Sequence, residues 1–277
     1  MTIAISLKVD DGVVLAADSA STLITASGNV ERIYNNANKI SNLYKGFPIG
    51  LITWGAGSIG APSISTLAKD LRRRFMGQGP STHPNWRIDP GNYSIEGVTV
   101  QVREFFFGEH YRAAYGSVPS PPDLGLIVAG YSAGRPLAEE WRIEVQAGQC
   151  GDPVRVRPDD TCGLTWAGQP EAINRVILGY GTGLPDALRQ LGVPEDQIGP
   201  ALSHIQTALD VNLVTPPMPI QDAIDLAEFL VYTAVMFSRF SPGAPVVGGP
   251  IEVAAITKHE GFKWIKRKHY FDARLNP

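Results

Sequence analysis

The chain begins with two segments rich in apolar residues, 3–9 and 13–17, separated by the turn Asp10-Asp11-Gly12. Apolar alternation on both sides of an Asp-Gly step is typical of a β-hairpin. Such a hairpin would hold Thr2 at the start of a strand and bring Asp18 near the far end of the second strand. A terminus tied into a core strand is unusual, because chain ends normally fray. An ordinary edge hairpin that begins a domain gives the same pattern.

Hydrophobic periodicity predicts the remaining elements. Strands are expected at 39–44, 49–54, 124–130, 141–145 and 162–168, and a closing hairpin at 251–256 and 262–265. Helices are expected at 62–75, 94–115, 170–179 and 220–240, with two short helices between 184 and 208. The polar, Asn-rich residues 19–38 predict a loop or an irregular hairpin. This order predicts a single α+β domain over 1–277, in which helices cover two stacked sheets.

Composition narrows the classes of function. Of the 277 residues, 44% are hydrophobic and 18% charged, which suits a large core, and the net charge of −3 argues against nucleic acid as a partner. We expect no membrane span and no signal peptide, and hence a cytoplasmic protein. Cys150 and Cys162 lack metal-ligand spacing, and no two of the five histidines are four residues apart, so neither a metal nor a cofactor is expected. The basic segment 263–268 is interpreted as a solvated strand and tail.

A glycine-rich turn, Gly55-Ala56-Gly57-Ser58-Ile59-Gly60, joins a predicted strand to a predicted helix. Backbone amides in such a turn can bind phosphate. The turn lacks the lysine of a nucleotide-binding P-loop and the full dinucleotide spacing. The same amides can instead form an oxyanion hole.

Several segments resemble a proteasome β subunit, in the same order along the chain. They are Thr-Ile-Ala-Ile from Thr2, Asp-Gly-Val-Val-Leu-Ala-Ala-Asp ending at Asp18, Asn-Lys-Ile at 38–40, the glycine turn after Trp54, and Gly-Gly-Pro-Ile-Glu-Val-Ala-Ala-Ile-Thr at 248–257. The chain is thereby similar to the N-terminal nucleophile (Ntn) hydrolases, in the proteasome-like bacterial branch. The resemblance implies a four-layer αββα sandwich, with insertions near 77–93 and 182–219.

The resemblance also implies roles for individual residues. Thr2 matches the nucleophilic threonine, Lys39 the catalytic lysine, and Asp18 the acid that orients this lysine. Thr22 matches the residue that holds the substrate backbone. The residue that supplies the oxyanion amide has two candidates. It is Gly57 if the turn is aligned with the family from the following helix, and Gly55 if it is aligned from the preceding strand.

The chemistry of these residues agrees with the implied roles. A threonine hydroxyl is a poor nucleophile unless a base is close. A free α-amine titrates near pH ~7.7–8.0 and can accept a proton at neutral pH. The ammonium of Lys39 would lower the pKa of the hydroxyl and keep the amine neutral, and Asp18 would stabilise that ammonium. The alternative is that Asp18 and Lys39 form an ordinary surface pair and that Gly57 begins a helix.

The chain departs from the family pattern at two places. Ala167 stands where the family has a supporting serine, and the Asp and Ser that precede the paired glycines have no counterpart in 239–247. Ser241 or Thr165 could substitute for them. These departures leave the type of reaction open.

The main hypothesis is an enzyme that cleaves peptide or amide bonds through an acyl-enzyme on Thr2, after removal of Met1. We expect a peptide or protein substrate and a homo-oligomeric ring or spiral, with an ATPase partner as an open option. One alternative is an Ntn acyltransferase or small-amide hydrolase. The other is a non-catalytic ring subunit, which the joint presence of Thr2, Asp18 and Lys39 disfavours.

Overall fold

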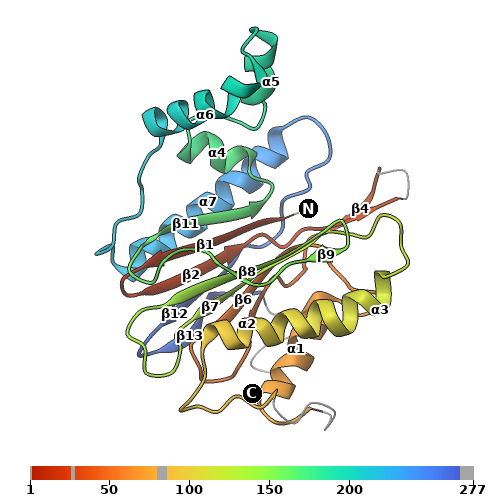
Figure 1. Ribbon diagram of the computed structural model, residues 1–277, viewed down its shortest axis with the longest axis vertical. Helices are drawn as coiled ribbons and strands as arrows, with labels where there is room; N and C mark the ends of the chain where they lie inside the picture. Colours follow the sequence, from red (N-terminus) through yellow and green to blue (C-terminus); the bar gives the residue numbers. More distant parts are fainter. Residues whose placement is uncertain (1, 26–28, 80–85, 269–277) are drawn as a thin grey trace.

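The computed structural model describes residues 2–25, 29–79 and 86–268, and it has a mixed α/β fold with antiparallel sheets (Figure 1). One sheet has five strands in the order β11-β1-β2-β12-β13. Their bounds are Ile3–Val9 (β1), Gly12–Ala17 (β2), Gly163–Gly168 (β11), Glu252–Thr257 (β12) and Gly261–Lys266 (β13). The predicted N-terminal and C-terminal hairpins are therefore both confirmed, and β2 and β12 join them side by side.

The second sheet follows the order β10-β8-β7-β6-β5, and the short strand β9 pairs with β8. Its strands are Ile40–Asn42 (β5), Ile49–Gly55 (β6), Leu124–Gly130 (β7), Glu139–Gln146 (β8), Gln149–Cys150 (β9) and Val154–Arg155 (β10). A separate hairpin of Ser21–Ile24 (β3) and Val30–Tyr34 (β4) lies in the region that the sequence predicts as a loop or irregular hairpin.

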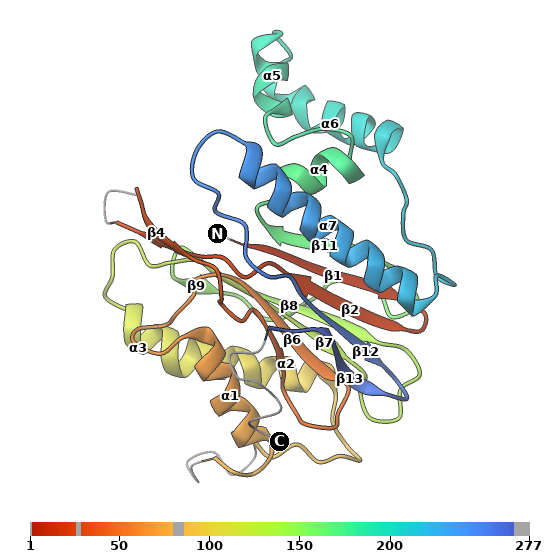
Figure 2. The same cartoon turned by 180° about the vertical axis from the view of Figure 1, so that it is seen from behind.

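Helices cover one face of each sheet (Figure 2). They are Ile64–Phe75 (α1), Ile95–Arg103 (α2), the π-helix Glu104–Tyr111 (η2), Arg112–Tyr115 (α3), Glu171–Ile177 (α4), Leu184–Gln190 (α5), Glu195–Leu209 (α6) and Ile220–Phe240 (α7). Side chains of α1, α2 and η2 form one core with β6, β7 and β8, and side chains of α4 and α7 form another with β1, β2 and β12. The helix predicted at 94–115 is thus confirmed from Ile95 to Tyr115, but its middle is a π-helix.

A third core lies between the two sheets and includes Ala4, Leu15, Ile52, Ile127 and Ala254. Since successive side chains of a strand point to opposite faces, the even-numbered residues of β1 face this inter-sheet layer. Two of them are polar. Ser6 donates to Glu140 Oε1 at 2.6 Å, and the Lys8 ammonium reaches the Asp159 carbonyl at 2.7 Å.

The inter-sheet layer also holds the buried acid Glu140, which belongs to no motif in the sequence. Glu140 is fully buried and accepts from Arg157 Nε at 2.6 Å, and Arg157 also binds the Thr165 hydroxyl. Buried charges are retained in folded proteins when they are paired in this way. Arg157 therefore links Glu140 of β8 to Thr165 of β11 and connects the two sheets. This link lies toward the end of β1 that is far from Thr2.

Helices α5 and α6 lie apart from the two sheets, at the end of the molecule beyond α4 (Figure 1). They belong to the predicted insertion at 182–219. Within these two helices only Ile198 is buried. The other expected insertion, near 77–93, includes residues 80–85, which lie outside the described residues. Among the described residues, no helix is long and apolar enough to cross a membrane.

Candidate active site

Thr2 directly precedes β1 and is 4% exposed. The register pairs Ile3 with Gly168 and Ala4 with Ala17, so Thr2 lies at the end of the sheet between β2 and β11. Its carbonyl accepts a hydrogen bond from the Gln169 amide at 2.7 Å. Gly168 has φ +98°, and a Cβ there would lie 1.9 Å from the Thr2 oxygen. Glycine at 168 therefore allows β11 to close over Thr2.

Asp18 follows β2 and is completely buried. Its Oδ1 accepts from the Ile3 amide at 3.1 Å and from the Lys39 ammonium at 2.5 Å. Its Oδ2 accepts from the amides of Ala20 at 3.1 Å and Gly248 at 3.0 Å. Four donors from different parts of the chain thus fix this carboxylate, which in turn fixes the start of β1 next to Thr2.

Lys39 directly precedes β5 and is 7% exposed. Its carbonyl accepts from the Thr53 amide of β6 at 3.0 Å, which holds its backbone against the second sheet. Burial lowers the pKa of Lys39 below its ordinary value, and the charge and hydrogen bond of Asp18 oppose this fall. The site thus holds a buried cation whose proton is bound less tightly than that of a solvated lysine.

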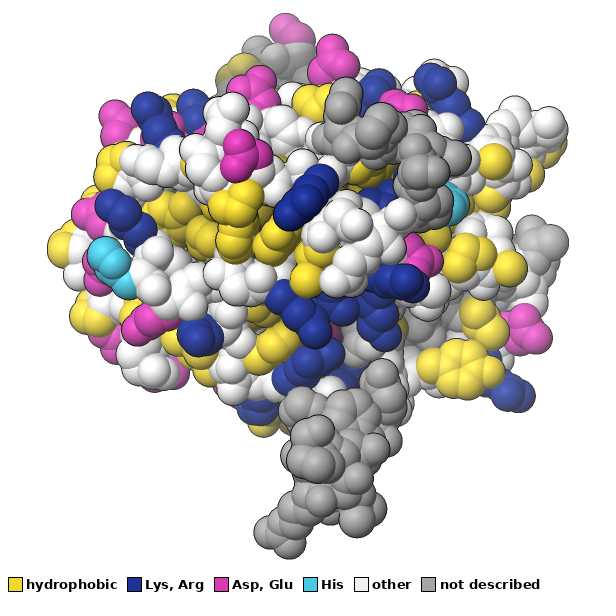
Figure 3. Space-filling model, turned by 90° about the horizontal axis from the view of Figure 1, so that it is seen from below, with side chains coloured by type: hydrophobic (Ala, Val, Ile, Leu, Met, Phe, Trp, Pro, Cys, Tyr) yellow, Lys and Arg dark blue, Asp and Glu magenta, His cyan; other side chains and the backbone are white. Residues whose placement is uncertain are grey.

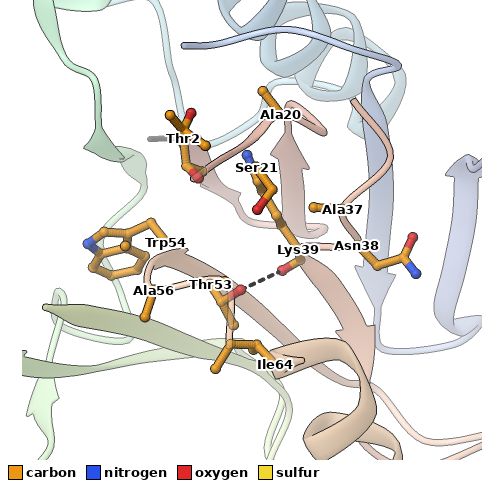
Figure 4. Close-up of a pocket in the computed structure, with 13 residues that line it drawn as sticks. Thr2, Ala20, Ser21, Ala37, Asn38, Lys39, Thr53, Trp54, Ala56 and Ile64 are labelled. Atoms are coloured by element: carbon orange, nitrogen blue, oxygen red, sulfur yellow. Dashed lines mark hydrogen bonds between the residues drawn. The ribbon is translucent and has the colours of Figure 1, made fainter. Parts of the chain in front are cut away.

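One pocket is lined by Thr2, Thr22, Lys39, Gly55 and Gly57 together. Figure 4 shows Thr2, Ser21, Lys39 and Thr53 lying around this pocket, with Trp54 and Ala56 on another side. The structure therefore brings four of the five sequence-predicted site residues to one cavity. Asp18 does not line it and lies behind Lys39.

Thr22 lies in β3, and its hydroxyl is buried with no hydrogen-bond partner among the described residues. A buried hydroxyl without a partner costs about 1–3 kcal/mol. Such a group at the wall of a cavity is available to a bound molecule.

The two glycine candidates differ in their surroundings. Gly55 has φ +83°, and a Cβ there would lie 2.4 Å from the Asp123 carbonyl, so its glycine is explained by strand packing. The Ala56 amide is already bonded to the Asp123 carbonyl at 2.8 Å. The Gly57 amide donates no hydrogen bond to any described residue, while its carbonyl accepts from the Ile64 amide at 3.0 Å. Of the amides at 56 and 57, the second is therefore the one open to a ligand.

A second pocket of about 270 Å³ borders Thr2, Trp54 and Gly55 as well. Its other walls include Asp123 and Glu144, and no Lys or Arg is among its described lining residues. The Glu144 carboxylate is paired with Arg142 at 3.7 Å, and Asp123 Oδ1 accepts from the Ala147 amide at 3.0 Å. The Trp54 indole lies against Gly125, where a Cβ would come within 1.9 Å of the ring. Trp54 lines both pockets, a position that its place before the glycine turn in the sequence does not reveal.

The hydroxyls that could replace the missing serine and aspartate do not reach Thr2. Thr165 is bound by Arg157, and Ser241 donates to the Phe237 carbonyl at 2.7 Å at the end of α7. Neither of them lines a pocket that contains Thr2. Ala167 is paired with Ala4 in the sheet. Across the described ranges, no group of three or more His, Cys, Asp and Glu residues is arranged to hold a metal ion.

No family model matches the chain, and no curated protein matches it. The sequence motifs suggested membership of the proteasome-like branch of the Ntn hydrolases; this assignment is corrected to a likeness of fold, because the solved structures that match are only 13–16% identical. The similarity that remains is one of structure.

Three solved structures illustrate this similarity. Anbu (ancestral beta-subunit) from Yersinia bercovieri has a TM-score of 0.53 at 13% identity, and the match covers 97% of this chain and 88% of that one. The helical assembly of the Anbu complex from Pseudomonas aeruginosa gives 0.51 at 16% identity, with 99% and 89% covered. Anbu from Hyphomicrobium sp. strain MC1 gives 0.50 at 14% identity, with 96% and 86% covered. At these identities the chain shares the fold of the ancestral β subunits over nearly its whole length.

Proposed function

We propose that this protein is an amide-bond hydrolase whose nucleophile is Thr2, acting as the first residue of the mature chain after removal of Met1. One observation carries the proposal: Thr2 shares a pocket with Lys39, and the Lys39 ammonium lies 2.5 Å from the buried Asp18 carboxylate. The free Thr2 amine supplies the general base, since it is weaker than an ordinary lysine amine by more than two pKa units.

In the first step the Thr2 hydroxyl passes its proton to the Thr2 amine, and its oxygen attacks the substrate carbonyl. The Gly57 amide donates to the oxyanion that forms, a contribution of about 3–4 kcal/mol in comparable sites. The tetrahedral intermediate then collapses: the ammonium of Thr2 gives its proton to the leaving amine, the C–N bond breaks, and an ester with Thr2 remains. Water attacks this ester, with the amine again as base, and regenerates Thr2.

Lys39 and Asp18 act as a pair in this scheme. The Lys39 cation lowers the pKa of both the hydroxyl and the amine of Thr2, because a nearby positive charge disfavours protonation. Asp18 fixes Lys39 and, through the Ile3 amide, the backbone next to the nucleophile. Both functions require the rigid carboxylate that four donors hold.

The substrate class that fits this site is an extended peptide or a related amide. The unpaired Thr22 hydroxyl and the open Gly57 amide lie on the same cavity as Thr2. A peptide bonded to β3 would be held as an added strand, which is a common mode of peptide recognition. We assign substrate binding to Thr22 and the oxyanion amide to Gly57 on this basis.

Acyl transfer to an amine is the second candidate. It is favoured by the acidic walls of the pocket on the Trp54 side of Thr2, where Asp123 and Glu144 would attract a cationic amine. Such an amine would attack the ester in place of water. Partition of one substrate between hydrolysis and transfer, measured with an added diamine, separates the two reactions.

For the architecture we propose the four-layer αββα arrangement of Ntn hydrolases, which the helix-covered sheets support. We also propose a homo-oligomer, a ring or spiral, since the Anbu complex of P. aeruginosa forms a helical assembly. Light scattering tests this assembly, and a monomer over the micromolar range would contradict it.

The test of the proposed function is peptide hydrolysis by the purified chain and by two Thr2 variants. Thr2→Ser keeps a hydroxyl and a free amine, and it should keep measurable turnover. Thr2→Ala keeps the amine alone and should lose turnover by a factor of at least about 10³. Equal turnover by the wild type and Thr2→Ala would rule out this nucleophile.

A further inference from the structure

Lys268 lies just beyond β13 and is not part of either pocket at Thr2. Its ammonium is 2.6 Å from the Ser19 hydroxyl, 2.6 Å from the Ala37 carbonyl and 3.2 Å from Glu252 Oε2. The first two contacts are hydrogen bonds, and the contact with Glu252 is an ion pair. The side chains of Lys268 and Glu252 are 13% and 1% exposed. The sequence-based interpretation of 263–268 as a solvated strand and tail is therefore wrong for Lys268.

Two of these three oxygens belong to the segments that carry Asp18 and Lys39. Ser19 directly follows Asp18, and Ala37 is two residues before Lys39. The Ala37 amide also donates to the Ser19 carbonyl at 2.9 Å. The Ser19 hydroxyl donates to the Pro250 carbonyl at 2.6 Å while it accepts from Lys268. The Lys268 ammonium thus joins both segments behind the site.

Lys268 and Glu252 also contribute charges near Lys39. The pKa of Lys39 is lowered first by burial and further by the Lys268 charge, while Asp18 and Glu252 oppose the fall. Lys268 itself has a lowered pKa because it is buried, and Glu252 and Asp18 oppose this. Two buried cations therefore lie among two buried carboxylates.

Other basic groups face this cluster from outside. Glu252 also borders a pocket with Lys69 and Arg72 of α1 and with Arg267. Lys and Arg side chains gather on the face of the molecule seen from below (Figure 3). The variants below leave these groups unchanged, so a difference between variants reports on Lys268 and Glu252 alone.

We propose that Lys268 is a positioning residue for the Thr2 site: it joins the segments of Asp18 and Lys39, and its charge, balanced by Glu252, contributes to the electrostatic field at Lys39. The inference rests on the proposed function of Thr2. The residue acts through the segments of Asp18 and Lys39, because it lines neither pocket at Thr2 and touches the lining only at the Ala37 carbonyl.

A purely structural role and an electrostatic role differ in what they predict. Lys268→Met removes a cation and leaves the buried Glu252 carboxylate without its partner. Both changes favour the protonated forms of Lys39 and of the Thr2 amine. Lys268→Arg keeps the charge. Lys268→Met combined with Glu252→Gln removes one charge of each sign and restores the balance.

The measurement is the rate of covalent modification of the full chain by a peptide epoxyketone, followed by intact mass as a function of pH. We expect Lys268→Met to shift the rising and the falling part of the rate–pH curve to higher pH by about 0.5–1 unit. Lys268→Arg should keep the wild-type profile, and the double variant should return toward it. A Lys268→Met profile that is lower in height but unshifted, or a double variant that shifts further upward, would overturn the proposal.

A second measurement separates this inference from the proposed function. The Lys39 side chain is titrated by NMR with ¹³C-labelled lysine, and Lys39→Arg identifies its signal. This experiment needs no activity. If the wild type is not modified at Thr2, the proposed function fails, but the inference about the field stands if Lys268→Met raises the pKa of Lys39. If the wild type is modified and the pKa of Lys39 is the same in both chains, the inference alone fails.

Discussion

The Lys39 ammonium lies 2.5 Å from Asp18 Oδ1, and both side chains are buried at one end of the inter-sheet layer. Asp18 has three further partners, the amides of Ile3, Ala20 and Gly248. The pair is therefore asymmetric. If Lys39 is removed, Asp18 keeps three donors. If Asp18 is changed, Lys39 loses its carboxylate partner, and no other carboxylate of the described residues lies within hydrogen-bond distance of it.

This asymmetry predicts unequal losses of stability. Asp18→Asn should lower the free energy of unfolding by about 3–5 kcal/mol, because it leaves an uncompensated buried cation and weakens three amide contacts. Lys39→Met should cost less, since it keeps the length of the side chain and leaves Asp18 with its backbone donors. Urea unfolding of the two variants checks this. A larger loss of unfolding free energy in Lys39→Met would mean that Lys39, and not the Asp18 carboxylate, holds this part of the structure together.

The lowered pKa of Lys39 predicts how stability depends on pH. Between this pKa and the ordinary value of about 10.4, the unfolded chain binds the lysine proton more tightly than the folded chain. The contribution of Lys39 to the free energy of unfolding therefore rises with pH in that window. Urea unfolding at several pH values should show a steeper rise in the wild type than in Lys39→Met. An equal rise of the unfolding free energy with pH in both proteins would contradict a lowered pKa of Lys39.

Thr22 should show a conflict between stability and binding. Thr22→Val replaces the unpaired buried hydroxyl by a methyl group of similar size, so the free energy of unfolding should rise by about 1 kcal/mol. If the hydroxyl holds the substrate, the same variant should raise KM while kcat changes little. Thr22→Ser, which keeps the hydroxyl, is the matched control. An unchanged KM in Thr22→Val would remove Thr22 from substrate binding.

Gly168 should be intolerant of any side chain. Gly168→Ala forces a methyl group against the Thr2 carbonyl at a positive φ, which should cost at least about 1–3 kcal/mol and displace Thr2. Modification of Thr2 should then be lost. Gly183→Ala is the control, because nothing lies within 4 Å of a Cβ at that position. Wild-type modification rates in Gly168→Ala would show that closure of β11 over Thr2 is dispensable.

The elements that the sequence predicts well are those with strong periodicity. The helix at 220–240 and the strand at 124–130 have the predicted bounds, because each is a long apolar segment with clear ends. The hairpin of β3 and β4 is predicted only as a loop or an irregular hairpin, because its strands are short, lie in an Asn-rich region and pair only with each other. The π-helix in 104–111 leaves no signal in the spacing that predicts a helix at 94–115.

The candidate site divides in the same way. A resemblance to known motifs could identify four of the site residues, because each lies in or beside a short, recognisable segment of the sequence. The structure brings these four to one cavity: Thr2, Lys39, Thr22 and Gly57. Their roles remain proposals. Lys268 could not be found in this way, because it reaches Ser19 and Ala37 only through tertiary packing across more than 200 residues. A short basic segment near a chain end is usually solvated, and this general rule concealed Lys268.

The intact mass of the purified protein, before and after treatment with a peptide epoxyketone, tests the central claim most directly. That reagent needs both the hydroxyl and the free amine of an N-terminal threonine to close its ring. The account predicts a chain without Met1 that gains the mass of one reagent molecule on Thr2, and no adduct in Thr2→Ala. A chain that retains Met1 and still hydrolyses peptides, or an undiminished adduct in Thr2→Ala, would contradict it.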